Sequence, residues 1–140
     1  MADTSNPPSP ALSGSLSGRQ AMISAVLGAV LWLAAALLLN ALKDTGIYEG
    51  AGQAFLFAAI IPGTAPFIWL IAKLAGLAKG QIALGTALAV GLATMLDGTA
   101  LTWFPDLYGG AQYTAGAGAT ILWGAGVSIA LGFVFDHRAR

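Results

Sequence analysis

Residues 21–42, AMISAVLGAVLWLAAALLLNAL, form a run of 22 residues without a charged side chain. A helix needs about 20 residues, at about 1.5 Å each, to cross a hydrocarbon core of about 30 Å. This stretch, Ala21 to Leu42, is therefore long enough and apolar enough to span a membrane as a helix.

Three further stretches have the same character. They are Ala51 to Leu74, Gln81 to Trp103 and Tyr113 to Phe135. Short connections between consecutive spans favour antiparallel neighbours, and lipid admits only helices or closed barrels. Period-two alternation is absent, and four strands cannot close a barrel. We therefore predict an all-α, four-helix transmembrane bundle over residues 21–135.

Composition agrees with this class and excludes others. Of the 140 residues, 57% are hydrophobic and 9% are charged, against about 25% charged in soluble domains. Six Lys and Arg balance six Asp and Glu, so no basic surface for nucleic acid is expected. The chain has no Cys, and its one His, His137, follows the last predicted span. We therefore expect no thiolate metal site, no haem and no other cofactor.

Both ends of the chain are polar. Residues 1–20, MADTSNPPSPALSGSLSGRQ, are rich in Ser, Pro and Gly and predict a flexible tail. A signal peptide would place its positive charge near the start, whereas Arg19 follows a polar leader and precedes a full-length span. A retained helix is favoured, and signal-anchor cleavage near Ala41 is the alternative. Residues 136–140, DHRAR, predict a short, solvated basic tail.

Basic residues predict the orientation in the membrane. Five of them flank the termini and the second loop: Arg19, Lys73, Lys79, Arg138 and Arg140. Lys43 stands alone on the opposite side, so the positive-inside rule predicts that both termini are cytoplasmic. The outer side would then carry an aromatic belt of interfacial anchors formed by Trp103, Phe104, Tyr108 and Tyr113.

Asp97 is the one acidic residue inside the predicted spans. It precedes Trp103 by six residues, about 9 Å along a helix. An ionised carboxylate at a span's centre costs about 2.5–3.5 kcal/mol, and somewhat less at this depth, so Asp97 should face protein or water. Thr94, one turn away, could donate to it; Asn40 lies at similar depth, and Lys43 could reach in from the interface. We favour a structural polar clasp, with proton or cation transport and partner binding as alternatives.

The second span contains Pro62-Gly63-Thr64-Ala65-Pro66 at its centre. Each proline lacks an amide hydrogen and clashes with the carbonyl four residues earlier, and Gly63 loosens the same turn. We predict a kink or short break at Pro62 and Pro66, with Thr64 satisfying a freed carbonyl. Broken helices form substrate sites in some transporters, but a kink without such a role is the favoured interpretation.

The last span carries a ridge of small residues spaced four apart: Gly116, Thr120, Gly124, Ser128 and Gly132. Such a stripe lets another helix approach closely. A shorter ridge of Ala83, Ala87 and Gly91 on the third span could meet it. We favour packing inside the bundle over homodimerisation through the same stripe.

The motif Met95-Leu96-Asp97-Gly98, followed by Trp103-Phe104-Pro105 and then Tyr108, resembles an uncharacterised family of small bacterial four-span inner-membrane proteins. The resemblance lies mainly in residues 80–110. In that family an acidic residue similarly follows Leu in the third span, which ends in an aromatic-Pro pair. The resemblance implies the four-span architecture and nothing catalytic. The Ser/Pro-rich leader departs from the family's compact N-terminus, so it implies nothing about that end.

A membrane-embedded enzyme would need a nucleophile with a base, a carboxylate pair or metal ligands within reach, and Asp97 has no acidic partner inside the spans. We therefore predict a non-enzymatic accessory or interaction protein in the lipid bilayer, in a homo-oligomer or a larger membrane complex. The alternative is a small proton- or cation-coupled transporter acting as an oligomer through Asp97. Small multidrug exporters use a Glu in the first span, which has no acidic residue here.

Overall fold

The computed structural model describes residues 14–138, and every regular element in them is helical. The elements are α1 (Gly18–Leu42), η1 (Lys43–Thr45), α2 (Gly50–Ala75), α3 (Ile82–Trp103), η2 (Pro105–Tyr108), η3 (Ala111–Tyr113) and α4 (Thr114–Arg138). All four α-helices are long and apolar enough to cross a membrane. The all-α prediction is confirmed. Most of the predicted N-terminal tail and the last two residues of the chain lie outside the described residues.

Two of the predicted boundaries move outward by three residues, and the others change by one residue or not at all. α1 begins at Gly18 rather than Ala21, because Ser17 and Gln20 form a capping box. The Ser17 hydroxyl accepts from the Gln20 amide at 3.2 Å, and the Gln20 side chain accepts from the Ser17 amide at 2.9 Å. At the other end, α4 continues through Arg138, so the start of the predicted C-terminal tail is helical.

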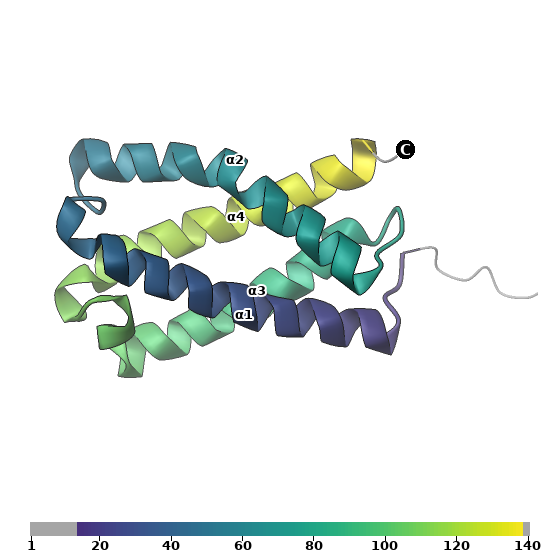
Figure 1. Cartoon of the computed structure of the whole chain (residues 1–140), viewed down its shortest axis with the longest axis horizontal. Coiled ribbons are helices and arrows are strands. Elements are labelled where there is room, and N and C mark those ends of the chain that lie inside the picture. Colours follow the sequence, from purple (N-terminus) through teal and green to yellow (C-terminus); the bar gives the residue numbers. More distant parts are fainter. Residues whose placement is uncertain (1–13, 139–140) are drawn as a thin grey trace, which may run out of the picture.

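The four helices run antiparallel in sequence order (Figure 1). The described termini and the α2–α3 connection lie at one end of the bundle, which we call the terminal end. The α1–α2 and α3–α4 connections lie at the opposite end, the loop end. α3 packs closely against both α1 and α4, whereas α2 packs mainly against α4. The contact between α1 and α3 is tight at Gly28, where a Cβ would lie 2.3 Å from the Ala89 carbonyl oxygen.

The small residues of α4 face other parts of the chain. A Cβ on Gly132 would lie 3.3 Å from the Ala83 Cα of α3, and one on Gly124 would lie 3.8 Å from Ile60 of α2. The hydroxyls of the ridge are satisfied within α4: Thr120 Oγ1 donates to the Gly116 carbonyl at 2.8 Å and Ser128 Oγ to the Gly124 carbonyl at 2.7 Å. The third-span ridge meets α4 through Ala83 and not through Gly91, which is exposed and has no atom within 4 Å of its Cβ position.

Trp123 links α4 to α2 near the middle of the bundle. Its ring stacks on Phe57 with centroids 5.2 Å apart and planes 6° from parallel. Its indole nitrogen donates to the Phe57 carbonyl at 3.0 Å, so this tryptophan within a candidate span has a partner for its N–H group.

The proline-rich part of α2 is not broken. The helix runs continuously from Gly50 to Ala75 with Pro62 and Pro66 inside it, so the short break considered above does not occur, and a bend stays a prediction. Thr64 Oγ1 donates to the Ile60 carbonyl at 2.6 Å, not to either carbonyl that the prolines free. A Cβ on Gly63 would meet nothing within 4 Å.

At the terminal end, the Asp136 side chain accepts hydrogen bonds from three backbone amides. Its Oδ1 accepts from the amides of Gly80 at 3.0 Å and Ile82 at 3.1 Å, and its Oδ2 accepts from the amide of Ala83 at 2.9 Å. These amides open α3, where the helix has unpaired donors and the positive end of its dipole. The residue expected to be solvated therefore caps a neighbouring helix.

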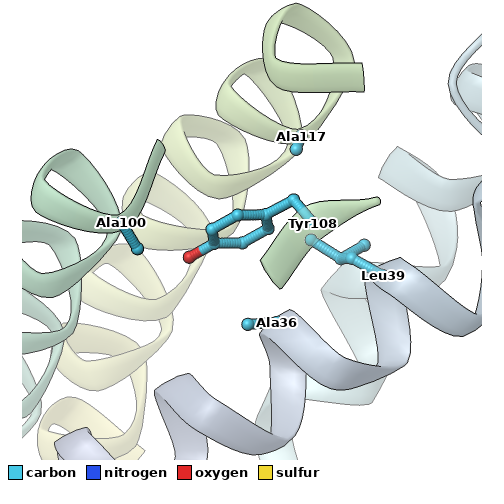
Figure 2. Packing of buried hydrophobic residues seen from close by; sticks show 5 residues of the cluster. All are labelled: Ala36, Leu39, Ala100, Tyr108 and Ala117. Atoms are coloured by element: carbon cyan, nitrogen blue, oxygen red, sulfur yellow. The ribbon is translucent and has the colours of Figure 1, made fainter. Parts of the chain in front are cut away.

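The loop end contains a small hydrophobic core around Tyr108, formed by Ala36, Leu39, Ala100, Tyr108 and Ala117 (Figure 2). Tyr108 is 0% exposed. Its ring lies among three alanines from α1, α3 and α4, with its hydroxyl on the side of Ala100 (Figure 2). The alanines leave the space that the ring fills, so the α3–α4 loop contributes a side chain to the interior.

Candidate functional site

Three side chains from separate elements meet inside the loop end. Asp97 of α3, which is 8% exposed, accepts a hydrogen bond at Oδ1 from the Trp32 indole of α1 at 2.9 Å. The same oxygen accepts from the Tyr108 hydroxyl of η2. The Trp32 indole nitrogen also lies 3.1 Å from the Tyr108 hydroxyl oxygen. We call Trp32, Asp97 and Tyr108 the Asp97 cluster.

The loop geometry directs Tyr108 into the bundle. Pro105 opens the 3₁₀ turn η2, and Gly109 and Gly110 follow it with φ of +100° and +117°. These left-handed conformations favour glycine and let the chain reverse directly after Tyr108. Burial raises the pKa of Tyr108 and the Asp97 carboxylate raises it further, so the phenol stays protonated and donates.

The aromatic-belt interpretation is wrong for Tyr108, because this side chain is fully buried. Trp103 and Phe104 are 70% and 65% exposed, as interfacial anchors would be. Tyr113 donates to Asp44 at 3.0 Å and so joins the two connections of the loop end. The four aromatic residues therefore divide between the surface and the interior.

Asn40 supports the cluster without touching Asp97. Its Nδ2 donates to the carbonyls of Asp106 and Leu107 at 3.1 Å each, which fixes the backbone of η2 beside α1. Lys43 Nζ donates to Asn40 Oδ1 at 2.9 Å and not to the carboxylate. Asn40 therefore lies beside the turn that carries Tyr108 and does not contact Asp97. The prediction that Lys43 reaches toward Asp97 is wrong.

Thr94 does not donate to Asp97. Its hydroxyl donates to the Val90 carbonyl at 2.9 Å, one turn back in its own helix. This local bond is the usual choice of a helical threonine, because the carbonyl four residues earlier is always in reach. The donors to Asp97 are instead Trp32 and Tyr108. The signal for Trp32 is that an indole N–H group inside an apolar span needs a partner. No sequence pattern indicates that Tyr108 turns inward.

The second carboxylate oxygen of Asp97 has no hydrogen-bond partner in the described part of the chain. Within residues 14–138, Oδ2 accepts no hydrogen bond and no cation pairs with Asp97. The same part of the chain contains no group of three His, Cys, Asp or Glu side chains that could hold a metal ion. Asp97 therefore combines one fully engaged oxygen with one available oxygen.

A cleft of about 480 Å³ borders the cluster, lined by all four helices together with Tyr108. Asp97 and Trp32 are part of its wall. The lining residues of α3 and α4 are buried or half-buried, whereas the exposed ones belong to α1 and α2: Ala34, Ala35, Leu38, Ala59, Gly63 and Phe67. The cleft therefore has its floor on α3 and α4 and opens between α1 and α2.

Comparisons with known proteins give no match: no family model, no curated protein and no solved structure matches this chain. The resemblance of residues 80–110 to a four-span bacterial family therefore stays a hypothesis. What the arrangement can do follows from its chemistry. It ties three elements together through one acceptor, and it places Asp97 in the wall of a cleft that is lined mainly by apolar residues.

Proposed function

We propose that this chain is a multi-pass protein of the bacterial inner membrane that acts as a non-enzymatic accessory or interaction protein. Its termini would lie in the cytoplasm, since five basic residues flank the termini and the second loop in the sequence, whereas Lys43 alone follows the first span. The family resemblance of residues 80–110 supports the same location.

One observation carries the non-enzymatic role: Asp97 Oδ1 is occupied by the Trp32 indole and the Tyr108 hydroxyl. The two donors come from α1 and η2, so the carboxylate holds these elements against α3. The cluster is thus suited to fix the shape of the loop end, which is the surface offered to a partner outside the membrane.

Purification from native membranes in mild detergent tests the accessory role. The tagged chain should retain one or more larger membrane proteins, identified by mass spectrometry. A tagged four-span protein of similar size, expressed at the same level, controls for nonspecific capture. Recovery of the chain with lipid alone would contradict the proposal.

The second candidate function is proton- or cation-coupled transport by an oligomer through Asp97. The observation that favours it is the position of Asp97 on the wall of the cleft, with Oδ2 unpaired among the described residues. Cells expressing the chain should then resist some members of a panel of cationic compounds. Asp97→Asn should abolish that resistance at equal protein level, and identical growth of the two strains would exclude this function.

A further inference from the structure

The cleft is accessible from the side of the bundle. Its exposed lining residues lie on α1 and α2, including Leu38, which is 58% exposed, and Phe67, which is 49% exposed. Because these helices span the membrane, the opening faces the lipid and not the water on either side. An occupant would therefore enter with an apolar surface, and a volume of about 480 Å³ falls in the range of sites for drug-sized molecules.

The polar lining leaves little for a hydrated ion. Four of the five serine and threonine hydroxyls of the lining already donate to carbonyls of their own helices: Thr64, Thr94, Thr120 and Ser128. The fifth, Thr86, is 1% exposed, and its hydroxyl has no hydrogen-bond partner among residues 14–138. A hydrated inorganic cation would exchange its water for an almost entirely apolar wall, which costs many kcal/mol. The lining thus disfavours an inorganic ion.

The charge of the cleft favours a cation nonetheless. Asp97 is its one ionisable acid, and no basic residue of the described chain lines it. A carboxylate in a low-dielectric site is stabilised by an opposite charge at contact distance far more than in water. Asp97 Oδ2, which accepts no hydrogen bond from residues 14–138, is the acceptor available for that contact.

We propose that this cleft binds an organic monocation, with its ammonium group at Asp97 Oδ2 and its compact apolar body between α1 and α2. The proposal rests on the membrane location given above and deepens the transport alternative by naming a substrate class. Binding itself requires neither transport nor a partner protein. If the accessory role or the transport role is disproved, binding of a cation in the cleft can still be tested separately.

The decisive experiment compares two probes that share one apolar cage and differ in their polar group, a charged ammonium or a neutral hydroxyl. Equilibrium dialysis at neutral pH of the purified chain in detergent, with empty micelles as blank, measures binding of 1-aminoadamantane and its neutral alcohol, 1-adamantanol. The amine should bind at least about tenfold more tightly than the alcohol. In Asp97→Asn the two affinities should become equal. The asparagine carbonyl can still accept from Trp32 and Tyr108, so this variant removes the charge while keeping the cluster.

A pair of glycine variants tests whether the probe occupies the cleft. Gly63 lines the cleft and Gly126 does not, and a Cβ on either residue would meet nothing within 4 Å. Both lie near the middle of a spanning helix, so Gly63→Leu and Gly126→Leu add the same bulk at comparable depth. Gly63→Leu should weaken binding of the amine by about tenfold, whereas Gly126→Leu should leave it unchanged.

Two results would overturn the proposal. Equal binding of amine and alcohol to the unaltered chain would mean that the cleft is an apolar groove for lipid acyl chains, without use of the Asp97 charge. Preference for the amine that survives both Asp97→Asn and Gly63→Leu would place the cation elsewhere. Thermal unfolding of each variant in the same detergent confirms that a loss of binding is not a loss of fold.

Discussion

The Tyr108 hydroxyl donates to Asp97 Oδ1 from a loop that leaves α3 and returns into the bundle. The two residues are only eleven positions apart, yet they belong to different elements. The α3–α4 connection is therefore part of the core and not a flexible link. Its position depends on one carboxylate inside the third span.

Tyr108→Phe should destabilise the bundle while keeping its shape. The ring still fills the space among the alanines, but Asp97 loses one of its two donors, which costs about 1–3 kcal/mol for a hydrogen bond to a carboxylate. Unfolding by denaturing detergent, followed by circular dichroism, measures the change. Tyr113→Phe is the matched control, because its hydroxyl bonds Asp44 at the surface and its loss should have little effect. Equal stability of Tyr108→Phe and the unaltered chain would contradict the role given to this hydroxyl.

Asp97→Ala should be more damaging than Asp97→Asn. Alanine leaves the Trp32 indole and the Tyr108 hydroxyl without their acceptor, at a cost of about 2–4 kcal/mol for two buried donors. Asparagine retains an acceptor and should cost about 1 kcal/mol or less. Melting temperatures in one detergent give the comparison. Unchanged melting and unchanged assembly of Asp97→Ala would rule out the clasp.

Asp136→Ala should loosen the terminal end. The carboxylate caps three amides at the start of α3, and loss of a helix cap costs about 1–2 kcal/mol. Hydrogen exchange of the Ile82 and Ala83 amides should accelerate before exchange in the rest of α3. Asp106→Ala, at an exposed aspartate with no hydrogen bond from its side chain among the described residues, is the control. Slow exchange at these two amides in Asp136→Ala would show that something else caps the helix.

Thr86→Val should be neutral or stabilising. The Thr86 hydroxyl is buried and has no hydrogen-bond partner within residues 14–138, so replacing it with a methyl group removes an unpaid desolvation cost of up to about 1 kcal/mol. Thr120→Val is the matched contrast, because that hydroxyl bonds the Gly116 carbonyl. In thermal unfolding, Thr120→Val should lower the melting temperature, whereas Thr86→Val should leave it unchanged or raise it. A marked loss of stability in Thr86→Val would reveal a partner for this hydroxyl.

Labelling of single cysteines tests the orientation. The chain contains no Cys, so Glu49→Cys at the loop end and Lys79→Cys at the terminal end each provide one exposed thiol. In intact bacteria with a permeabilised outer membrane, a membrane-impermeant maleimide should label the first and not the second. The opposite pattern would invert the proposed topology, and labelling of both would indicate two orientations.

The spans were predictable because a helix that crosses lipid must meet two strict requirements. It needs apolar side chains over about 20 residues, and it must satisfy its backbone hydrogen bonds internally. Length and hydropathy alone therefore locate such helices. The start of α1 was missed by three residues, although Ser17 and Gln20 have the spacing of a capping box. The function of Asp136 was not predictable, because its partners are backbone amides of another helix, and nothing in the local sequence specifies them.

Asp97, at the centre of the candidate site, was predictable from the sequence, whereas its hydrogen-bond donors were not. Asp97 stands out from the sequence because a charge inside a span needs compensation. Its donors depend on how α1 is rotated toward α3 and on the turn at Gly109 and Gly110, and both are properties of the assembled bundle. Helical spacing suggested Thr94, but that hydroxyl bonds its own helix first. A loop tyrosine was assigned to the surface, and the structure buries it.

The cap formed by Asp136 is completed only late in synthesis of the chain. A ribosome makes the opening amides of α3 long before it makes Asp136, which lies 56 positions after Gly80. Until α4 has been synthesised and packed beside α3, the amides of Gly80, Ile82 and Ala83 lack the carboxylate that accepts from them. The last helix of the chain therefore completes the start of the helix before it.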